Sequence, residues 1–243
     1  REQIFAALSE IADPESIELF IKELGTEKDL TSYSALSALI KIGKPAVKPL
    51  TDAFHSAKED KYRWRIFTIL IMIADPESID LFINELDNPN EALGKVARSA
   101  LIKIGKPATT SLRNALKTAE RGYPRYRILS ILSLIGDPSL IDLFLDGLKD
   151  KNQVIRDISS QGLEKIGEPA VEPLIKLGQT TDEAAVRDST FLILYKIQGY
   201  EATKNMERPY KPGILLAINL TQSVSVFSDW YEKTVASNYN CHK

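Results

Sequence analysis

The sequence predicts an all-α fold, a right-handed superhelix of stacked helix pairs built from 31-residue repeats. Two observations carry this prediction. The ten letters SALIKIGKPA occur at residues 37–46 and again at 99–108. When the chain is written in rows of 31, isoleucine, leucine and proline fall into columns. Repeats of about 20–50 residues are typical of solenoids, because each unit buries its apolar face against the next.

Three columns define the repeat. The isoleucines occupy one position in seven successive rows, the leucines stand three residues before them, and the prolines stand three residues after them until Tyr200 interrupts the column. The members are Ile11, Ile42, Ile73, Ile104, Ile135, Ile166 and Ile197; Leu8, Leu39, Leu70, Leu101, Leu132, Leu163 and Leu194; and Pro14, Pro45, Pro76, Pro107, Pro138 and Pro169.

Each row predicts two helices. Apolar residues in the first helix recur at helical spacing, and this helix ends at Gly or Ala shortly before the proline. The second helix begins where Asp13, Asp75 or Asp137 can cap it, with the following proline in the first helical position. We expect Leu70 and Leu132 to be buried between repeats.

The organisation predicted for the chain is a solenoid over residues 1–198 followed by a divergent cap over 199–243. The solenoid holds about six helix pairs and a seventh first helix near 182–197. Helical spacing over 213–236 favours a helical cap, and the alternation in SVSVF (223–227) leaves a strand open. Because residue 1 aligns with the start of a repeat, we expect a fragment or an end covered by a partner.

Composition excludes several classes of protein. The 243 residues carry a net charge of −2 and are 44% hydrophobic, so the whole chain has no strong attraction to nucleic acid or to an anionic membrane. No run of about 18 apolar residues is present, so no membrane span is expected. The single cysteine, Cys241, allows no internal disulfide. We expect a cytoplasmic protein.

Stretches such as ALIKIGKPAVKPL and LSLIGDPSLIDLFLDGL resemble HEAT repeats, in particular the short HEAT-like repeats of the phycobilisome lyase type. The resemblance covers residues 1 to about 200. It implies that first helices form the convex layer and that second helices line a concave groove. An arginine near the start of the first helix also resembles that family, although Ser32 and Gly94 depart from it; the arginines are Arg1, Arg63, Arg125, Arg156 and Arg187.

Catalytic and metal-binding patterns are missing from the sequence. The two histidines, His55 and His242, lie far apart in the sequence, one on a repeat helix and one in the tail, and no phosphate-binding loop or nucleophile elbow occurs. Deoxyhypusine hydroxylase, a HEAT-like enzyme, carries paired His-Glu motifs that this chain lacks. We therefore expect a non-catalytic protein without a cofactor.

The polar face of the second helices is the predicted partner-binding site. Two ladders of side chains, with six carboxylates against three lysines, favour a protein or peptide that is basic and partly apolar. The predicted contact residues are Glu18, Leu19, Lys22, Lys48, Asp52, Asp80, Leu81, Asn84, Asn114, Asp142, Leu143, Asp146, Glu172 and Lys176.

Two other functions remain open. One is an enzyme subunit resembling a phycobilin lyase. The other is nucleic-acid binding through the segments KYRWR (61–65) and YPRYR (123–127), whose Arg, Trp and Tyr could contact phosphates and bases. Acidic residues can neutralise these arginines inside the array, with Glu85 and Asp87 facing Arg63 and Arg65. We also expect Trp64 and Tyr126 to fill equivalent packing positions. We favour the protein-interaction scaffold.

Overall fold

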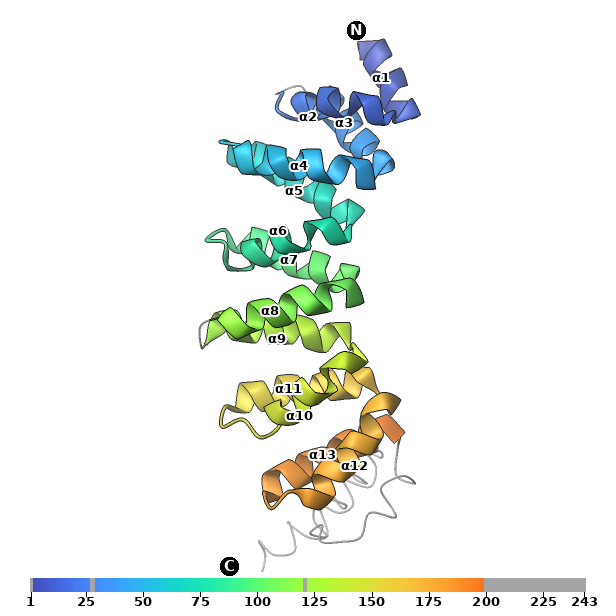
Figure 1. Cartoon of the computed structure of the whole chain (residues 1–243). Coiled ribbons are helices and arrows are strands. Elements are labelled where there is room, and N and C mark those ends of the chain that lie inside the picture. The colour runs from blue at the N-terminus through green and yellow to red at the C-terminus, as the bar shows by residue number, and fades with distance from the viewer. Residues whose placement is uncertain (1, 27–28, 120–121, 199–243) are drawn as a thin grey trace, which may run out of the picture.

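A computed structural model describes residues 2–26, 29–119 and 122–198. Within these ranges the chain is helical and contains no strand. The helices stack along one axis in an elongated array (Figure 1). The all-α superhelical fold predicted from the sequence is confirmed, and the predicted cap over 199–243 lies outside the described residues.

Helices alternate between two layers. The first helices of the repeats are α1 (Glu2–Ile11), α3 (Asp29–Ile42), α5 (Asp60–Ile73), α7 (Glu91–Ile104), α9 (Tyr123–Ile135), α11 (Gln153–Ile166) and α13 (Ala184–Gln198). The second helices are α2 (Ile17–Leu24), α4 (Lys44–Ser56), α6 (Ile79–Asn84), α8 (Thr109–Thr118), α10 (Ile141–Gly147) and α12 (Val171–Thr180).

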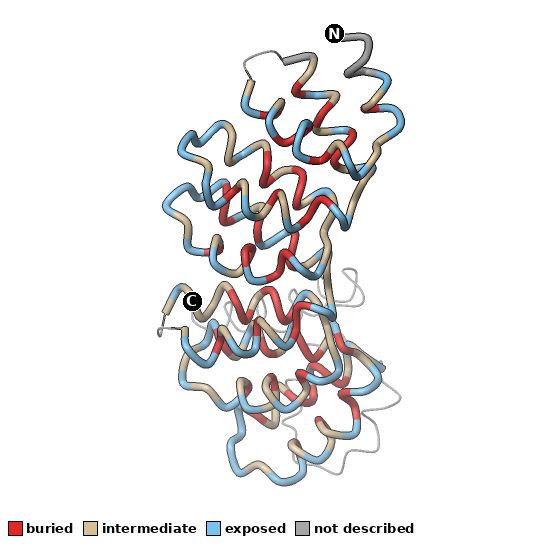
Figure 2. The backbone as a smooth tube through the Cα atoms, turned by 45° about the horizontal axis from the view of Figure 1, so that its top comes forward, coloured by how far each residue is buried: buried red, intermediate tan, exposed pale blue. Residues whose placement is uncertain are grey.

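The most extensive packing joins helices of consecutive repeats. Each second helix packs against the first helix that follows it, as α2 does on α3 and α12 on α13 (Figure 1). The buried residues form one continuous core between the two layers (Figure 2). Leu70 and Leu132 are fully buried in it, as the leucine column predicts.

The turn between the layers uses the predicted capping residues. The carboxylates of Asp13, Asp75 and Asp137 accept hydrogen bonds from the backbone N–H two residues later, at 3.1, 2.9 and 2.9 Å. Each begins a short 3-10 helix: η1 (Pro14–Ser16), η2 (Pro76–Ser78) or η5 (Pro138–Leu140). The turns between α7 and α8 and between α11 and α12 hold η4 (Lys106–Ala108) and η6 (Glu168–Ala170).

Asp137 also joins two repeats. Thr109 Oγ1 donates a hydrogen bond of 3.0 Å to Asp137 Oδ2. Partial burial acts to raise the pKa of the Asp137 carboxyl, but the hydrogen bonds from Ser139 and Thr109 outweigh it, so this pKa lies below its ordinary value. The charged carboxylate is therefore the form that the fold stabilises.

The residue that ends α5 is in an unfavourable conformation. Ala74 has φ +52°, in the left-handed region, whereas the equivalent residue after α9 is Gly136 with φ +65°. A side chain makes this conformation costly, and glycine tolerates it. We expect Ala74→Gly to raise the free energy of unfolding by about 0.5–1 kcal/mol in urea denaturation.

The control for Ala74→Gly is Ala7→Gly, in the middle of α1, where glycine should lower stability by about 1 kcal/mol because it favours the unfolded chain. If Ala74→Gly destabilised the protein as much as Ala7→Gly, the left-handed turn after α5 would be incorrect.

Candidate functional site

The polar residues of the predicted binding site all lie on the second helices and are exposed. They project from one layer of the array, so the structure brings them to one face, called here the second-helix face. They are Glu18 and Lys22 on α2; Lys48 and Asp52 on α4; Asp80 and Asn84 on α6; Asn114 on α8; Asp142 and Asp146 on α10; and Glu172 and Lys176 on α12.

The three predicted leucines differ from one another. Leu19 is 44% exposed, Leu143 is partly buried against the core, and Leu81 is only 4% exposed. Leu81 is therefore not available to a partner, contrary to the prediction. Its helix, α6, is short and lies between two 3-10 helices, η2 and η3 (Glu85–Asp87).

A groove of about 540 Å³ lies between α10 and α12 on this face. Four predicted residues line it: Asp142, Asp146, Glu172 and Lys176. The structure adds Leu145, Lys149, Pro173, Leu177 and Thr180, which the sequence analysis did not select. Leu145 and Leu177 belong to the apolar pattern of their helices, so no sequence signal separates them from core leucines. The groove thus combines charged walls with apolar side chains.

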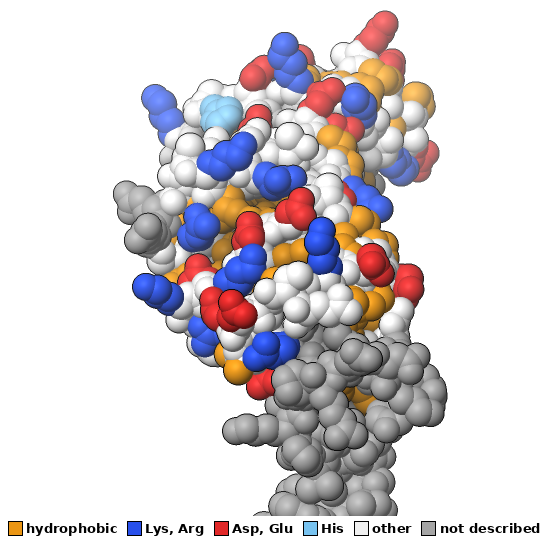
Figure 3. Space-filling view, turned by 60° about the horizontal axis from the view of Figure 1, so that its bottom comes forward, with side chains coloured by type: hydrophobic (Ala, Val, Ile, Leu, Met, Phe, Trp, Pro, Cys, Tyr) orange, Lys and Arg blue, Asp and Glu red, His pale blue; other side chains and the backbone are white. Residues whose placement is uncertain are grey.

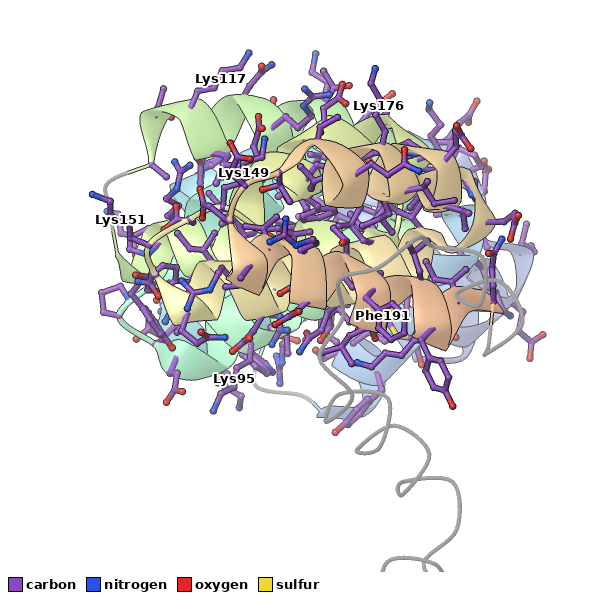
Figure 4. The ribbon with its side chains drawn as sticks, turned by 90° about the horizontal axis from the view of Figure 1, so that it is seen from below. Lys95, Lys117, Lys149, Lys151, Lys176 and Phe191 are labelled. Carbon is purple, nitrogen blue, oxygen red and sulfur yellow. The ribbon has the colours of Figure 1, made fainter. Side chains whose placement is uncertain are left out.

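Charges in the groove are only partly paired. Lys149 Nζ lies 3.3 Å from Asp146 Oδ1, an exposed pair that contributes little to stability. Among the described residues, Asp142 and Glu172 have no cation within ion-pair distance. Figure 4 shows Lys149 and Lys176 on the layer opposite Lys95, which projects from a first helix. Unpaired carboxylates beside leucines suit a ligand that is both cationic and apolar.

The two layers pack with different closeness. Neighbouring first helices contact each other more extensively than neighbouring second helices do, especially around α9 and α11. That the second helices line a concave groove stays a prediction. Acidic, basic and apolar side chains are interspersed on the surface of the array (Figure 3).

The match to known families falls on the C-terminal part of the array. Residues 109–194, from α8 to α13, match the family model of HEAT repeats. Residues 109–194 carry HEAT repeats. No curated protein sequence matches the chain.

Several solved structures are similar to this helical array. One is the complex of CpcE and CpcF of phycocyanin lyase from Nostoc sp., with 19% identity, a TM-score of 0.36, and coverage of 74% of this chain and 99% of that chain. Human deoxyhypusine hydroxylase shows 15% identity, a TM-score of 0.38, and coverage of 82% and 79%. A designed armadillo repeat protein shows 14% identity, a TM-score of 0.36, and coverage of 75% and 100%.

Arginines of the first helices hold neighbouring repeats together. Arg63 Nη2 lies 3.7 Å from Glu85 Oε1, as predicted, and its guanidinium stacks on the Phe54 ring at 4.6 Å. Arg65 does not pair with Asp87, contrary to the prediction. Arg65 donates to the carbonyl oxygens of Leu24 and Thr26, at 2.7 and 3.0 Å.

Asp87 instead pairs with Arg127, whose Nη1 is 2.9 Å away and also donates to the Leu86 carbonyl. Cations at the end of a helix stabilise its free carbonyls and its dipole. These arginines therefore stabilise the fold, which weakens the hypothesis that they bind nucleic acid.

The aromatic residues of the two basic segments are not equivalent. Trp64 is 40% exposed, whereas Tyr126 is half-buried and its hydroxyl accepts a hydrogen bond of 2.5 Å from the Asn152 amide. The expectation that Trp64 and Tyr126 fill equivalent packing positions is therefore wrong. The structural reason is that only Tyr126 has a polar partner at the edge of the core.

The described residues contain no group of three or more His, Cys, Asp or Glu side chains that could hold a metal ion. His55 is exposed near the end of α4, where its ring meets Phe54 edge-on at 5.8 Å. Cys241 and His242 lie outside the described residues. No described helix combines the length and hydrophobicity needed to cross a bilayer.

Proposed function

We propose that this HEAT array is a non-catalytic scaffold that binds a partner protein on its second-helix face. The groove between α10 and α12 carries the proposal, because it places Asp142 and Glu172 beside the apolar Leu145 and Leu177. A surface of this composition can hold a basic side chain at its charged wall and an apolar one on its leucines. A repeat array multiplies such a contact along its length.

The proposed partner carries a basic and partly apolar segment. The two ladders hold six carboxylates and three lysines, giving a local net charge of −3. Each exposed ion pair is screened and contributes little alone, so affinity would come from several contacts together. Binding should therefore weaken as the salt concentration rises. We also propose that the protein acts in the cytoplasm.

Charge reversal tests this function. Random peptides displayed on phage are selected against the chain, and the expected winners contain Lys or Arg beside Leu or Ile. Asp80→Lys combined with Asp142→Lys should weaken the binding of a selected peptide several-fold, because both side chains are exposed. Fluorescence anisotropy measures the affinity, and circular dichroism verifies the fold.

The matched control combines Asp157→Lys with Glu183→Lys. It makes the same charge change at exposed residues outside the second-helix face, on α11 and just before α13. Equal binding losses in both double variants would show that net charge alone attracts the peptide. Unchanged binding in the Asp80→Lys, Asp142→Lys variant would remove the second-helix face as the site.

A further inference from the structure

Large exposed apolar side chains concentrate on the first helices. Among the described residues, Leu19 is the one such side chain on a second helix. Exposed aromatic, Met and Leu side chains that gather on one face are a mark of interaction surfaces. Those on the first helices are Ile11, Tyr33, Trp64, Met72, Tyr123, Leu134, Val154 and Leu192.

One position near the end of the first helices alternates between lysine and an apolar residue from the second repeat to the sixth, after the exposed Glu10 of the first repeat. Met72 is 53% exposed and Leu134 is 43% exposed, while the lysines are all exposed. Successive first helices pack against one another, and Lys103 Nζ lies 3.0 Å from the Met72 carbonyl oxygen. This lysine–apolar ladder consists of Lys41, Met72, Lys103, Leu134 and Lys165.

The ladder is cationic, and it follows the acidic Glu10, which holds the same position on α1. Among the described residues, neither Lys41 nor Lys165 has an acidic group within ion-pair distance. Lys103 donates to the carbonyls of Ile71 and Met72, and its ammonium has three donors. The next lysine in the column, Lys196, is paired with Glu164 at 2.6 Å, so the cationic surface ends there.

We propose that the lysine–apolar ladder binds an acidic, partly apolar segment of a partner protein in an extended conformation. Packed helices lie about 8–10 Å apart. A polyproline II segment repeats every three residues with a rise of 3.1 Å per residue, or about 9 Å. An extended segment with Asp or Glu and an apolar residue alternating at every third position therefore matches the ladder step by step.

A protein segment fits the ladder better than a nucleic acid does. A nucleic-acid strand carries a phosphate at every nucleotide, so phosphates would fall against Met72 and Leu134 as well as against the lysines. Arginine, whose planar fork suits phosphate, is engaged inside the fold at Arg65 and Arg127. The alternation of charge and apolar surface instead requires a ligand that alternates in the same way.

Lysines near a helix C-terminus also stabilise the helix dipole, so binding must be measured separately from stability. The probe is a synthetic peptide of about 13 residues, the length that spans four ladder steps in the polyproline II conformation, with Asp and Leu alternating at every third position. Fluorescence anisotropy at low salt should show binding to the full chain. Lys41→Glu combined with Lys165→Glu should weaken it at least ten-fold.

The matched control is Lys48→Glu combined with Lys176→Glu, which makes the same charge change on the second-helix face and should leave binding within about two-fold. Met72→Ser with Leu134→Ser should weaken binding several-fold, whereas Leu19→Ser should not. If the glutamate variant unfolds in circular dichroism, Lys41→Gln with Lys165→Gln replaces it, and a several-fold loss is then expected.

Three results would overturn the proposal. The full chain could fail to bind the acidic peptide, both lysine variants could lose binding equally, or single-stranded oligothymidylate could bind through Lys41 and Lys165 in place of the peptide. The proposed function is tested with basic peptides and other residues, so either proposal can fail while the other stands.

Discussion

Leu132→Ala should lower the free energy of unfolding by ~2–5 kcal/mol. Leu132 is fully buried on α9, and its carbonyl oxygen accepts the hydrogen bond from Gly136 N–H that ends the helix. Removing the side chain leaves a cavity in the core between repeats, where closely packed neighbours can relax only partly. Urea denaturation followed by circular dichroism measures the change.

The control for Leu132→Ala is Leu134→Ala, two residues later on the same helix. Leu134 is 43% exposed, so its truncation should change stability by no more than about 0.5 kcal/mol. Repeat arrays can unfold in parts, so local stability should be measured as well. The amide hydrogens of α9 should exchange faster in Leu132→Ala than in Leu134→Ala. Equal stability of the two variants would mean that the core between the layers is misplaced.

Gly94→Arg should also destabilise the protein, by about 1–3 kcal/mol, although arginine occupies the equivalent position in five other repeats, as Arg63 does on α5. Comparison of repeats alone would expect a gain. The structure shows why glycine is present, since a Cβ at residue 94 would lie 2.8 Å from the Leu86 carbonyl oxygen. That oxygen belongs to the backbone and also accepts from Arg127, so it cannot move away freely.

Ala92→Arg, at an exposed position in the first turn of α7, is the control for Gly94→Arg and should be nearly neutral. Differential scanning calorimetry compares the two proteins. A melting temperature for Gly94→Arg equal to or above that of the unchanged chain would contradict the close approach of α7 to Leu86.

Local chemistry made much of the fold predictable. The caps Asp13, Asp75 and Asp137 and the buried Leu70 and Leu132 follow from rules that act over a few residues, and a repeated sequence applies them many times. The departure of Gly94 from the arginine column was visible in the sequence. Its cause was not visible, because it depends on how closely two helices approach.

The binding site was harder to predict. A helical wheel places residues by their angle on one helix alone, and it fails for Leu81, which is buried although the equivalent Leu19 is exposed. The pairing of Arg65 failed for another reason: its partner carbonyl at Leu24 is 41 residues away and two repeats earlier. The ladder that contains Lys103 and Met72 is not apparent from the sequence, because the arginines are the more conspicuous basic residues of the first helices, and the fold itself engages them.

Arg65 and Arg127 have a further, mechanical consequence. Each bonds to the end of a second helix two repeats earlier, at Leu24 and Leu86, so each bridge spans an intervening repeat. The equivalent position one double repeat further along is Ser189, whose hydroxyl bonds within its own helix to Ala185. Under tension along its axis, the array should therefore extend less over its first five repeats than over the part toward α13.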